Sequence, residues 1–194
     1  MKLNLDLFKV DPNKKIPEKG VVLVSEPFLK DSYFTKSVVL ITEHNDNGSV
    51  GFILNQKSNF RIKDFIDDFP VDTDIFVGGP VDMNSLYYIH NKGNYIYNSV
   101  QITDDLYWGG NFEDIKDCLQ NNIICVQDIR FFIGYSGWEK GQLEKELDND
   151  YWIITKTSTQ NILTENTNLW EDCLNNIGGK YKSWVNTPAD PALN

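Results

Sequence analysis

The sequence contains few of the residues from which metal centres and disulfides are built. Among its 194 residues there are 3 cysteines and 2 histidines. Cys118, Cys125 and Cys173 are odd in number and form no Cys-x-x-Cys pair, so we expect reduced thiols rather than disulfides. His44 and His90 show no spacing typical of metal ligands. We therefore expect no metal and no structural disulfide.

Long apolar runs are also absent. No stretch approaches the roughly 20 apolar residues that a membrane-spanning helix needs. The first residues alternate apolar and polar side chains, so they lack the unbroken apolar centre of a signal peptide. We expect a cytoplasmic protein without membrane association.

Positive charge is scarce. There are 18 basic residues against 28 acidic ones, which gives a net charge of −10. Such a surface repels nucleic-acid phosphates at long range. The charge therefore argues against direct nucleic-acid binding as the main activity.

What the sequence does contain is a core. Hydrophobic residues make up 41% of the chain, which is typical of a globular protein rather than a disordered one. No repeat or linker divides it, so we expect a single domain over residues 1–194. Residues 1–20, with two prolines, are interpreted as an N-terminal leader segment, and residues 180–194 as an extended C-terminal tail.

Apolar periodicity predicts a mixture of strands and helices. A β-hairpin is expected over 38–54, because Asn45-Asp-Asn-Gly48 supplies a tight turn between two strands. Helices are expected at 62–69, from 112 with Asn111 as its cap, and at 169–177. Further strands are expected at 21–25, 74–77, 86–90 and 151–155, the last beside the central strand described next.

The stretch from Ile129 to Leu147 is predicted to be the centre of the fold. It begins with an apolar run, continues through Gly134-Tyr-Ser-Gly137, and ends in a charged segment with Leu143 and Leu147 four residues apart. This pattern predicts a buried strand, a tight turn and an amphipathic helix. The glycines are expected to bend the chain for architectural reasons.

The same corner invites a catalytic alternative. Gly134-Tyr-Ser136-Gly-Trp138 resembles the nucleophile elbow Gly-x-Ser-x-Gly, but Trp138 stands where the second glycine is required. Both histidines precede Ser136, although triads with other orders exist. A hydrolase or transferase using Ser136 or His44 therefore remains the alternative. The glycine spacing matches neither nucleotide-binding fingerprint, so no cofactor is expected.

Two further motifs have a plain structural interpretation beside a functional one. His44 follows Glu43 and could act as a general base, or it could only hydrogen-bond the hairpin turn. Gly78-Gly79-Pro80 follows a predicted strand, where it permits either a close approach of a ligand or a sharp exit from the sheet.

Taken together, the motifs resemble the AlgH/YqgE family of bacterial proteins, over about residues 20–155. The matching pieces are Ser25-Glu-Pro with Phe34, Val38-Val-Leu-Ile-Thr-Glu-His-Asn45, Gly51-Phe-Ile-Leu-Asn55, Gly78-Gly-Pro-Val81, His90, Gly134-Tyr-Ser-Gly-Trp138 and Gly141-Gln-Leu-Glu144. The Trp-Gly-Gly110 segment and the proline-containing tail are similar to the Bacteroidetes-type branch.

This resemblance implies an α+β fold: a small closed β-barrel with a branching, mostly antiparallel sheet, surrounded by helices. The family that the chain resembles has no established enzymatic activity, so the resemblance transfers no catalytic residue. Some family members are described as transcriptional regulators because of effects on alginate production, without a DNA-binding motif. Family members often carry alanine at the position of Ser136, which weakens the nucleophile interpretation.

We therefore expect a non-catalytic binding or regulatory module with an unknown small ligand or a protein partner. The residues expected to meet that ligand lie at the hairpin and the glycine corners. They are Glu43, His44, Asn55, Gly78, Gly79, Gly134, Tyr135, Ser136, Gly137 and Trp138.

Overall fold

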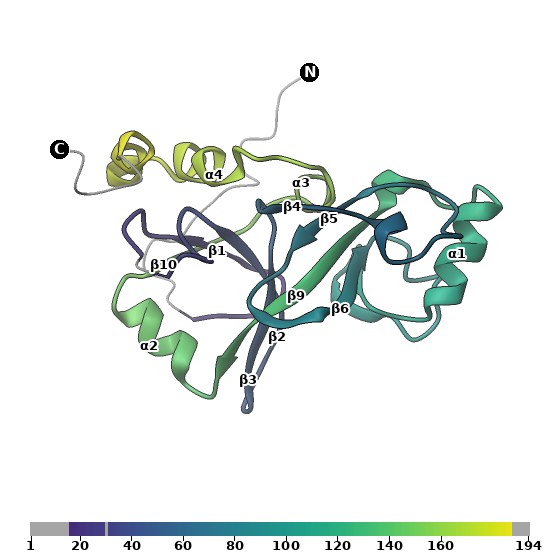
Figure 1. Ribbon diagram of the computed structural model, residues 1–194. Helices are drawn as coiled ribbons and strands as arrows, with labels where there is room; N and C mark the ends of the chain where they lie inside the picture. The colour runs from purple at the N-terminus through teal and green to yellow at the C-terminus, as the bar shows by residue number, and fades with distance from the viewer. Residues whose placement is uncertain (1–15, 30, 188–194) are drawn as a thin grey trace, which may run out of the picture.

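The protein is built on a 10-stranded, mostly antiparallel sheet that helices cover (Figure 1). The computed structural model describes residues 16–29 and 31–187. The strands are β1 (Val22–Ser25), β2 (Val38–Asn45), β3 (Gly48–Ile53), β4 (Lys57–Arg61), β5 (Asp74–Val77), β6 (Val81–His90), β7 (Val100–Thr103), β8 (Leu106–Trp108), β9 (Ile129–Glu139) and β10 (Trp152–Thr155).

The helical elements are short and lie between or after the strands. The α-helices are α1 (Phe112–Gln120), α2 (Gln142–Asp148), α3 (Thr159–Leu163) and α4 (Leu169–Ile177), and the 3₁₀ segments are η2 (Ile62–Asp64), η3 (Val126–Asp128) and η4 (Gly179–Asn186). As predicted, Asn111 caps α1: its side-chain oxygen accepts a hydrogen bond from the Glu113 amide at 3.0 Å.

The strands follow the order β10-β1-β2-β3-β9-β6-β8-β7, and the sheet branches at β9. There β5 pairs with β9 and carries β4 on its other side. The β5–β9 pairing is parallel, while the other pairings of the described residues are antiparallel. The expected branching, mostly antiparallel sheet is therefore confirmed.

The expected closed barrel is wrong, because the two ends of the sheet do not pair. In the described residues β7 is hydrogen-bonded only to β8, and β1 already has β10 on one edge and β2 on the other. The segment before β1 does approach β7, since the Lys19 ammonium donates a hydrogen bond to the Gln101 carbonyl at 2.8 Å. With both edges of β1 occupied, no strand ladder can close there.

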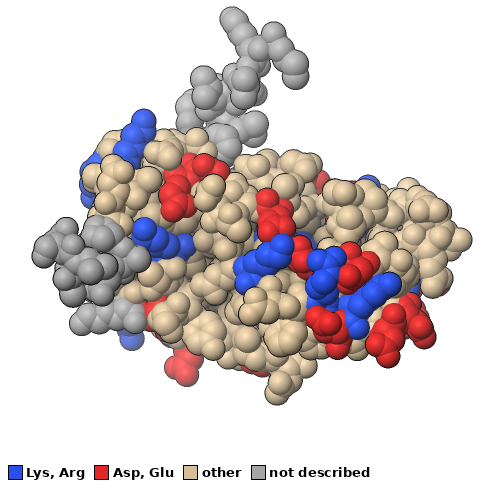
Figure 2. Space-filling model, turned by 45° about the horizontal axis from the view of Figure 1, so that its top comes forward, with Lys and Arg blue, Asp and Glu red and all other residues tan. Residues whose placement is uncertain are grey.

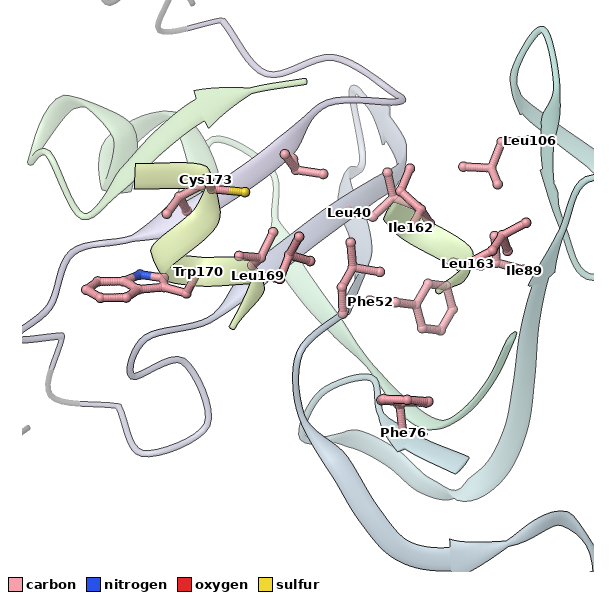
Figure 3. Close-up of a cluster of buried hydrophobic side chains, with 14 of the residues drawn as sticks. Leu40, Phe52, Phe76, Ile89, Leu106, Ile162, Leu163, Leu169, Trp170 and Cys173 are labelled. Carbon is pink, nitrogen blue, oxygen red and sulfur yellow. The ribbon is translucent and has the colours of Figure 1, made fainter. Parts of the chain in front are cut away.

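Three apolar clusters hold helices against the sheet. The largest places α3 and α4 against strand residues such as Leu40, Phe52 and Phe76 (Figure 3). A second lies under α1 around Phe131, and a third joins α2 to β1, β2 and β10 through Trp138 and other residues. Burial of these apolar faces is the main stabilising contribution to the fold.

The hairpin over residues 38–54 is confirmed. The Asn47 amide donates to the Asn45 side chain at 2.8 Å, which fixes the turn between β2 and β3. Gly48 follows with φ of 135°, a conformation that favours glycine. The turn stands at the free tip of the β2–β3 hairpin (Figure 1).

Several expectations are wrong in detail. Residues 62–69 form only the short segment η2, because Phe65 is exposed rather than on the buried side of a helix. β10 pairs with β1, not with β9. The tail is not extended over its first part: η4 turns there, and Tyr181 and Trp184 pack on the largest cluster.

The remaining parts of the predicted leader and tail, residues 1–15 and 188–194, lie outside the described residues.

Candidate functional site

The strand β9 has two halves with different neighbours. Ile129–Ile133 lies between β5 and β6, whereas residues 136–139 pair with β3. Gly134 stands between the halves with φ of +65°, and a Cβ there would lie 2.5 Å from the Gly79 carbonyl oxygen. The glycine thus permits a bend and a close backbone approach.

The turn predicted at Gly134–Gly137 is therefore wrong. β9 continues as a strand to Glu139, and the chain turns only at Gly141, where φ is +74°, before α2 begins. The glycines of this motif therefore lie where β9 changes its neighbouring strand from β5 to β3, and not at a turn between a strand and a helix.

Ser136 is fully buried, with 0% of its surface exposed. Its hydroxyl donates a hydrogen bond to the Gly78 carbonyl at 2.9 Å, so it fastens β9 to the segment before β6. His44 and His90 hydrogen-bond other groups, Ser49 and Gly109. An active nucleophile needs a base in contact and an approach for substrate, and this geometry contradicts the catalytic alternative at Ser136.

His44 belongs to a chain of polar groups that the sequence did not reveal. Its Nδ1 lies 2.8 Å from the Ser49 hydroxyl, and its Nε2 lies 3.8 Å from a Glu144 carboxylate oxygen. The contact between His44 and Ser49 could have been predicted from the hairpin, because its register pairs these two residues directly. Ser49 is only 5% exposed and pairs with Trp138, whose indole packs towards α2, so its hydroxyl is no accessible nucleophile.

Three other predicted residues have backbone roles. The Asn55 side chain accepts from the Val38 amide and donates to the Lys36 carbonyl, both at 2.8 Å. A Cβ on Gly78 would lie 2.3 Å from the Gly134 carbonyl oxygen, and Gly79 has φ of +153°. These positions hold the strands together rather than face a ligand site.

The outer face of the β2–β3–β9 end of the sheet carries an open groove of about 370 Å³. Directly paired residues of antiparallel strands point to the same face. Glu43 pairs with Val50, and Val50 pairs with Gly137, so this row of residues crosses the groove. Gly137 contributes no side chain and leaves the floor hollow.

The floor of the groove is apolar and its rim is acidic. Val50, Val81 and Tyr135 supply the apolar surface, and Glu43 and Glu139 stand among the lining residues. No lysine or arginine of the described part of the chain lines it. The electrostatic field of this surface therefore favours a cation.

Neighbouring residues fix the Tyr135 ring at one wall. Tyr87 packs edge-on against it, with ring centroids 5.6 Å apart, and its hydroxyl donates to an Asp82 oxygen at 2.7 Å. Burial, together with this bond, raises the pKa of Tyr87 to about 12, so the phenol stays a donor at neutral pH. The wall is held in place before any ligand arrives.

Of the predicted ligand residues, the structure brings four to the groove: Glu43, Tyr135, Gly137 and Trp138. The indole of Trp138 lies on the other face and donates to Glu146 at 2.8 Å. No sequence motif pointed to the other lining residues, which include the asparagines of the hairpin turn, Val50, Val81 and Glu139, because strand pairing alone brings them together. Within residues 16–29 and 31–187, no group of three metal-ligating side chains is placed to hold an ion.

A sequence profile described as AlgH-like matches residues 22–182, most of the chain. The chain belongs to the AlgH-like family. Its relatives include a UPF0301 protein of Parabacteroides distasonis, which is 39% identical over 97% of this chain and 98% of that protein. A UPF0301 protein of Cytophaga hutchinsonii is 42% identical over 91% of this chain and 98% of that protein.

Two solved structures share the fold of this AlgH-like protein. The Corynebacterium diphtheriae protein DIP2367 has a TM-score of 0.76 at 22% identity, covering 89% of this chain and 93% of that one. The AlgH protein from Pseudomonas aeruginosa has a TM-score of 0.67 at 20% identity, covering 89% and 96%. At such identities the similarity supports the fold alone. None of the described helices is both long and apolar enough to cross a membrane.

Proposed function

We propose that this AlgH-like protein is a non-catalytic binding module whose groove takes a basic segment of a partner polypeptide. The observation that carries the proposal is the combination, at the exposed end of the sheet, of an apolar floor with an acidic rim. Val50 and Tyr135 offer surface for an aliphatic side chain, and Glu43 and Glu139 offer charge for flanking lysines or arginines.

A polypeptide suits the groove better than a small molecule. Small-ligand sites usually enclose most of their ligand, whereas this groove is wide open to solvent. Its floor is a row of paired strand residues across β2, β3 and β9, a surface along which an extended chain can lie. The net charge of −10 disfavours direct contact with DNA. If the protein has a regulatory role, we propose that it acts by binding such a partner polypeptide.

We place this function in the cytoplasm. The cysteines Cys118, Cys125 and Cys173 are free thiols, two of them buried, and the fold uses no disulfide among the described residues. Free thiols of this kind suit a reducing compartment.

The test is an NMR titration of the isotopically labelled protein with two capped peptides, Lys-Lys-Val-Val-Lys-Lys and Glu-Glu-Val-Val-Glu-Glu. The basic peptide is expected to shift the amide signals of Val50, Tyr135 and Gly137 in a saturable manner. The acidic peptide should leave them unchanged because the rim repels it. Equal shifts with both peptides, or shifts confined to another surface, would contradict the proposal.

A further inference from the structure

A second cavity lies where the end of β10 meets the helices α3 and α4, and its volume is about 170 Å³. Its lining is mostly polar: four asparagines, two threonines and one aspartate stand beside a single leucine. None of its lining residues belongs to the groove. We call it the α4 cavity. Its composition differs from that of the groove floor, so it suits a different kind of ligand.

The inner wall of the α4 cavity carries a hydroxyl without a partner. Thr155 is the last residue of β10, and only 6% of its surface is exposed. Side chains alternate along a strand, so Thr155 points to the same face as Ile153, which packs in one cluster with α4. No described residue hydrogen-bonds the Thr155 hydroxyl. Its oxygen, unlike the Nε atom of Arg130, keeps contact with open space. A ligand in the cavity can therefore supply the missing hydrogen bond.

Helix α4 contributes two rows of side chains to the cavity. Leu169 and Cys173, four residues apart, pack towards the sheet (Figure 3). Asp172 and Asn176, also four residues apart, stand at the exposed rim. Burial raises the pKa of the Cys173 thiol to about 12, so this group is uncharged at neutral pH. The inner wall thus offers a hydroxyl, a neutral thiol and an apolar surface.

The polar groups of the rim are only partly engaged with one another. The Asn166 amide donates to one Asp172 oxygen at 2.9 Å, and the Asn161 amide donates to the Thr157 hydroxyl at 3.0 Å. The other Asp172 oxygen and the Asn161 carbonyl oxygen remain open as acceptors. No described residue bonds the Asn176 amide, which can donate and accept. The open positions therefore suit a ligand that does both.

No strong field of either sign selects an ion at the α4 cavity. Of the described residues that line it, Lys156 and Asp172 alone are charged, with opposite signs. Glu18 lies 3.3 Å from the Lys156 ammonium but is not part of the lining, and an ion pair as exposed as this one contributes little. Figure 2 turns the end of the molecule that carries α3 and α4 forward, and basic and acidic side chains are intermixed on the face it presents. This surface favours a neutral ligand.

We propose that the α4 cavity binds a small neutral polyhydroxy compound, a short polyol or a sugar of similar size. Hydroxyls donate and accept as water does, so they can displace water from a polar cavity without leaving its groups unpaired. One hydroxyl of the ligand bonds Thr155, others bond Asp172 and Asn161, and the carbon chain lies against Leu169. This site is separate from the groove, and the inference does not depend on the proposed function.

The test is an NMR titration of the isotopically labelled protein with erythritol. The control is the butanediol that has the same carbon chain but hydroxyls at its ends only, and ethanolamine serves as a small hydroxylated cation. We expect erythritol to shift the amide signals of Thr155, Asn161 and Asn176 in a saturable manner, and the diol to bind several-fold more weakly. No saturable shift with erythritol, equal affinity for the diol, or tighter binding of ethanolamine would overturn the proposal.

Two variants separate binding from folding. Thr155→Val replaces the hydroxyl by a methyl group, and because this hydroxyl has no partner, stability should not fall. Asn176→Ala removes the rim amide at an exposed helical position, where alanine is tolerated well. Each should weaken erythritol binding several-fold, whereas Thr73→Val, which removes a hydroxyl outside the cavity, should not. Unchanged affinity in either folded variant would contradict the inference.

Discussion

The two halves of β9 differ in burial, in neighbours and in the work they do. Each residue of Ile129–Ile133 is buried, and strands lie on both edges. Beyond Gly134, buried residues alternate with partly or fully exposed ones, and β3 is the neighbour. The first half is a core strand that is buried on both faces, with Arg130 as its one charged residue, whereas the second has one face on the core and one on the groove.

This difference explains why the glycines sit where they do. Gly134 allows the strand to leave β5 and join β3, with a positive φ at the bend. Gly137, three residues later, has an ordinary strand conformation and leaves space above the groove floor. Gly134 is needed for its backbone conformation, whereas Gly137 is needed because any side chain there would fill the groove. Substitutions in the two halves should therefore have different consequences.

The largest expected effect is in the core half. Phe131 is fully buried and packs edge-on against Phe69, with ring centroids 5.5 Å apart. Phe131→Ala should lower the free energy of unfolding by about 3–5 kcal/mol through lost burial and a new cavity. Val50→Ala, on the groove floor, should cost about 1 kcal/mol because Val50 is only half-buried. Urea denaturation measures both; similar losses would contradict the comparison.

The two glycines provide the next test. Gly134→Ala places a Cβ at positive φ and 2.5 Å from the Gly79 carbonyl oxygen, so it should destabilise the fold by at least about 1–3 kcal/mol. In Gly137→Ala the new Cβ would meet the Tyr135 ring at 3.3 Å and the Val81 side chain at 3.8 Å, and no backbone atom is among these nearest contacts. That variant should change stability by less than about 1 kcal/mol. Equal thermal stability of the two variants would show that Gly134 does not govern the bend.

Ser136 lies just past the bend and should have a moderate effect. Ser136→Ala removes the hydrogen bond to the Gly78 carbonyl, at a cost of about 1 kcal/mol. The cost is limited because the same carbonyl also accepts the Ile53 amide at 2.9 Å. Chemical denaturation should show this small loss. An unchanged stability would mean that the hydroxyl does not fasten the two segments.

The core half should also show a mild pH dependence through His90, which pairs with Ile129. Its neutral ring accepts the Lys92 amide at Nδ1 and donates to the Gly109 carbonyl from Nε2. Burial lowers the pKa of His90 below its ordinary value of 6.5. The unfolded chain therefore binds this proton more readily. The neutral ring's contribution to stability is therefore fully present above about pH 6.5. It is lost as the pH falls from there towards the lowered pKa of the folded protein, with a slope of at most about 1.4 kcal/mol per pH unit.

Denaturation midpoints measured from neutral pH downwards would reveal this slope. In His90→Gln the slope should be smaller than in the wild type, whatever the absolute stability of the variant. If the free energy of unfolding of His90→Gln falls with pH as steeply as that of the wild type, groups other than His90 cause the pH dependence.

The sequence predicted the local elements better than their partners. The β2–β3 hairpin was predictable because Asn45 and Gly48 define the turn within a few residues. The open form of the sheet was not predictable, because closure would require β7 to pair with the free edge of a strand that lies far away in the sequence. The continuation of β9 past Gly137 was missed for the same reason: glycine is compatible with a turn and with a strand, and the pairing with β3 decides.

The candidate site was predicted only in part. Glu43, Tyr135 and Gly137 were named from motifs, and they do line the groove. Val50, Val81 and Glu139 were missed, since only strand register places them beside those residues. Ser136 and Gly78 were named for the same motifs and proved to be bonded to each other. A motif indicates where a chain is constrained, but not which face its residues present.

The central claim is that the groove on the second half of β9 recognises a basic segment. Calorimetric titration of wild type and Gly137→Val with the Lys-Lys-Val-Val-Lys-Lys peptide tests it most directly. We expect the valine side chain to fill the floor and reduce affinity at least tenfold, while thermal stability changes little. An affinity unchanged by a filled floor would contradict the account.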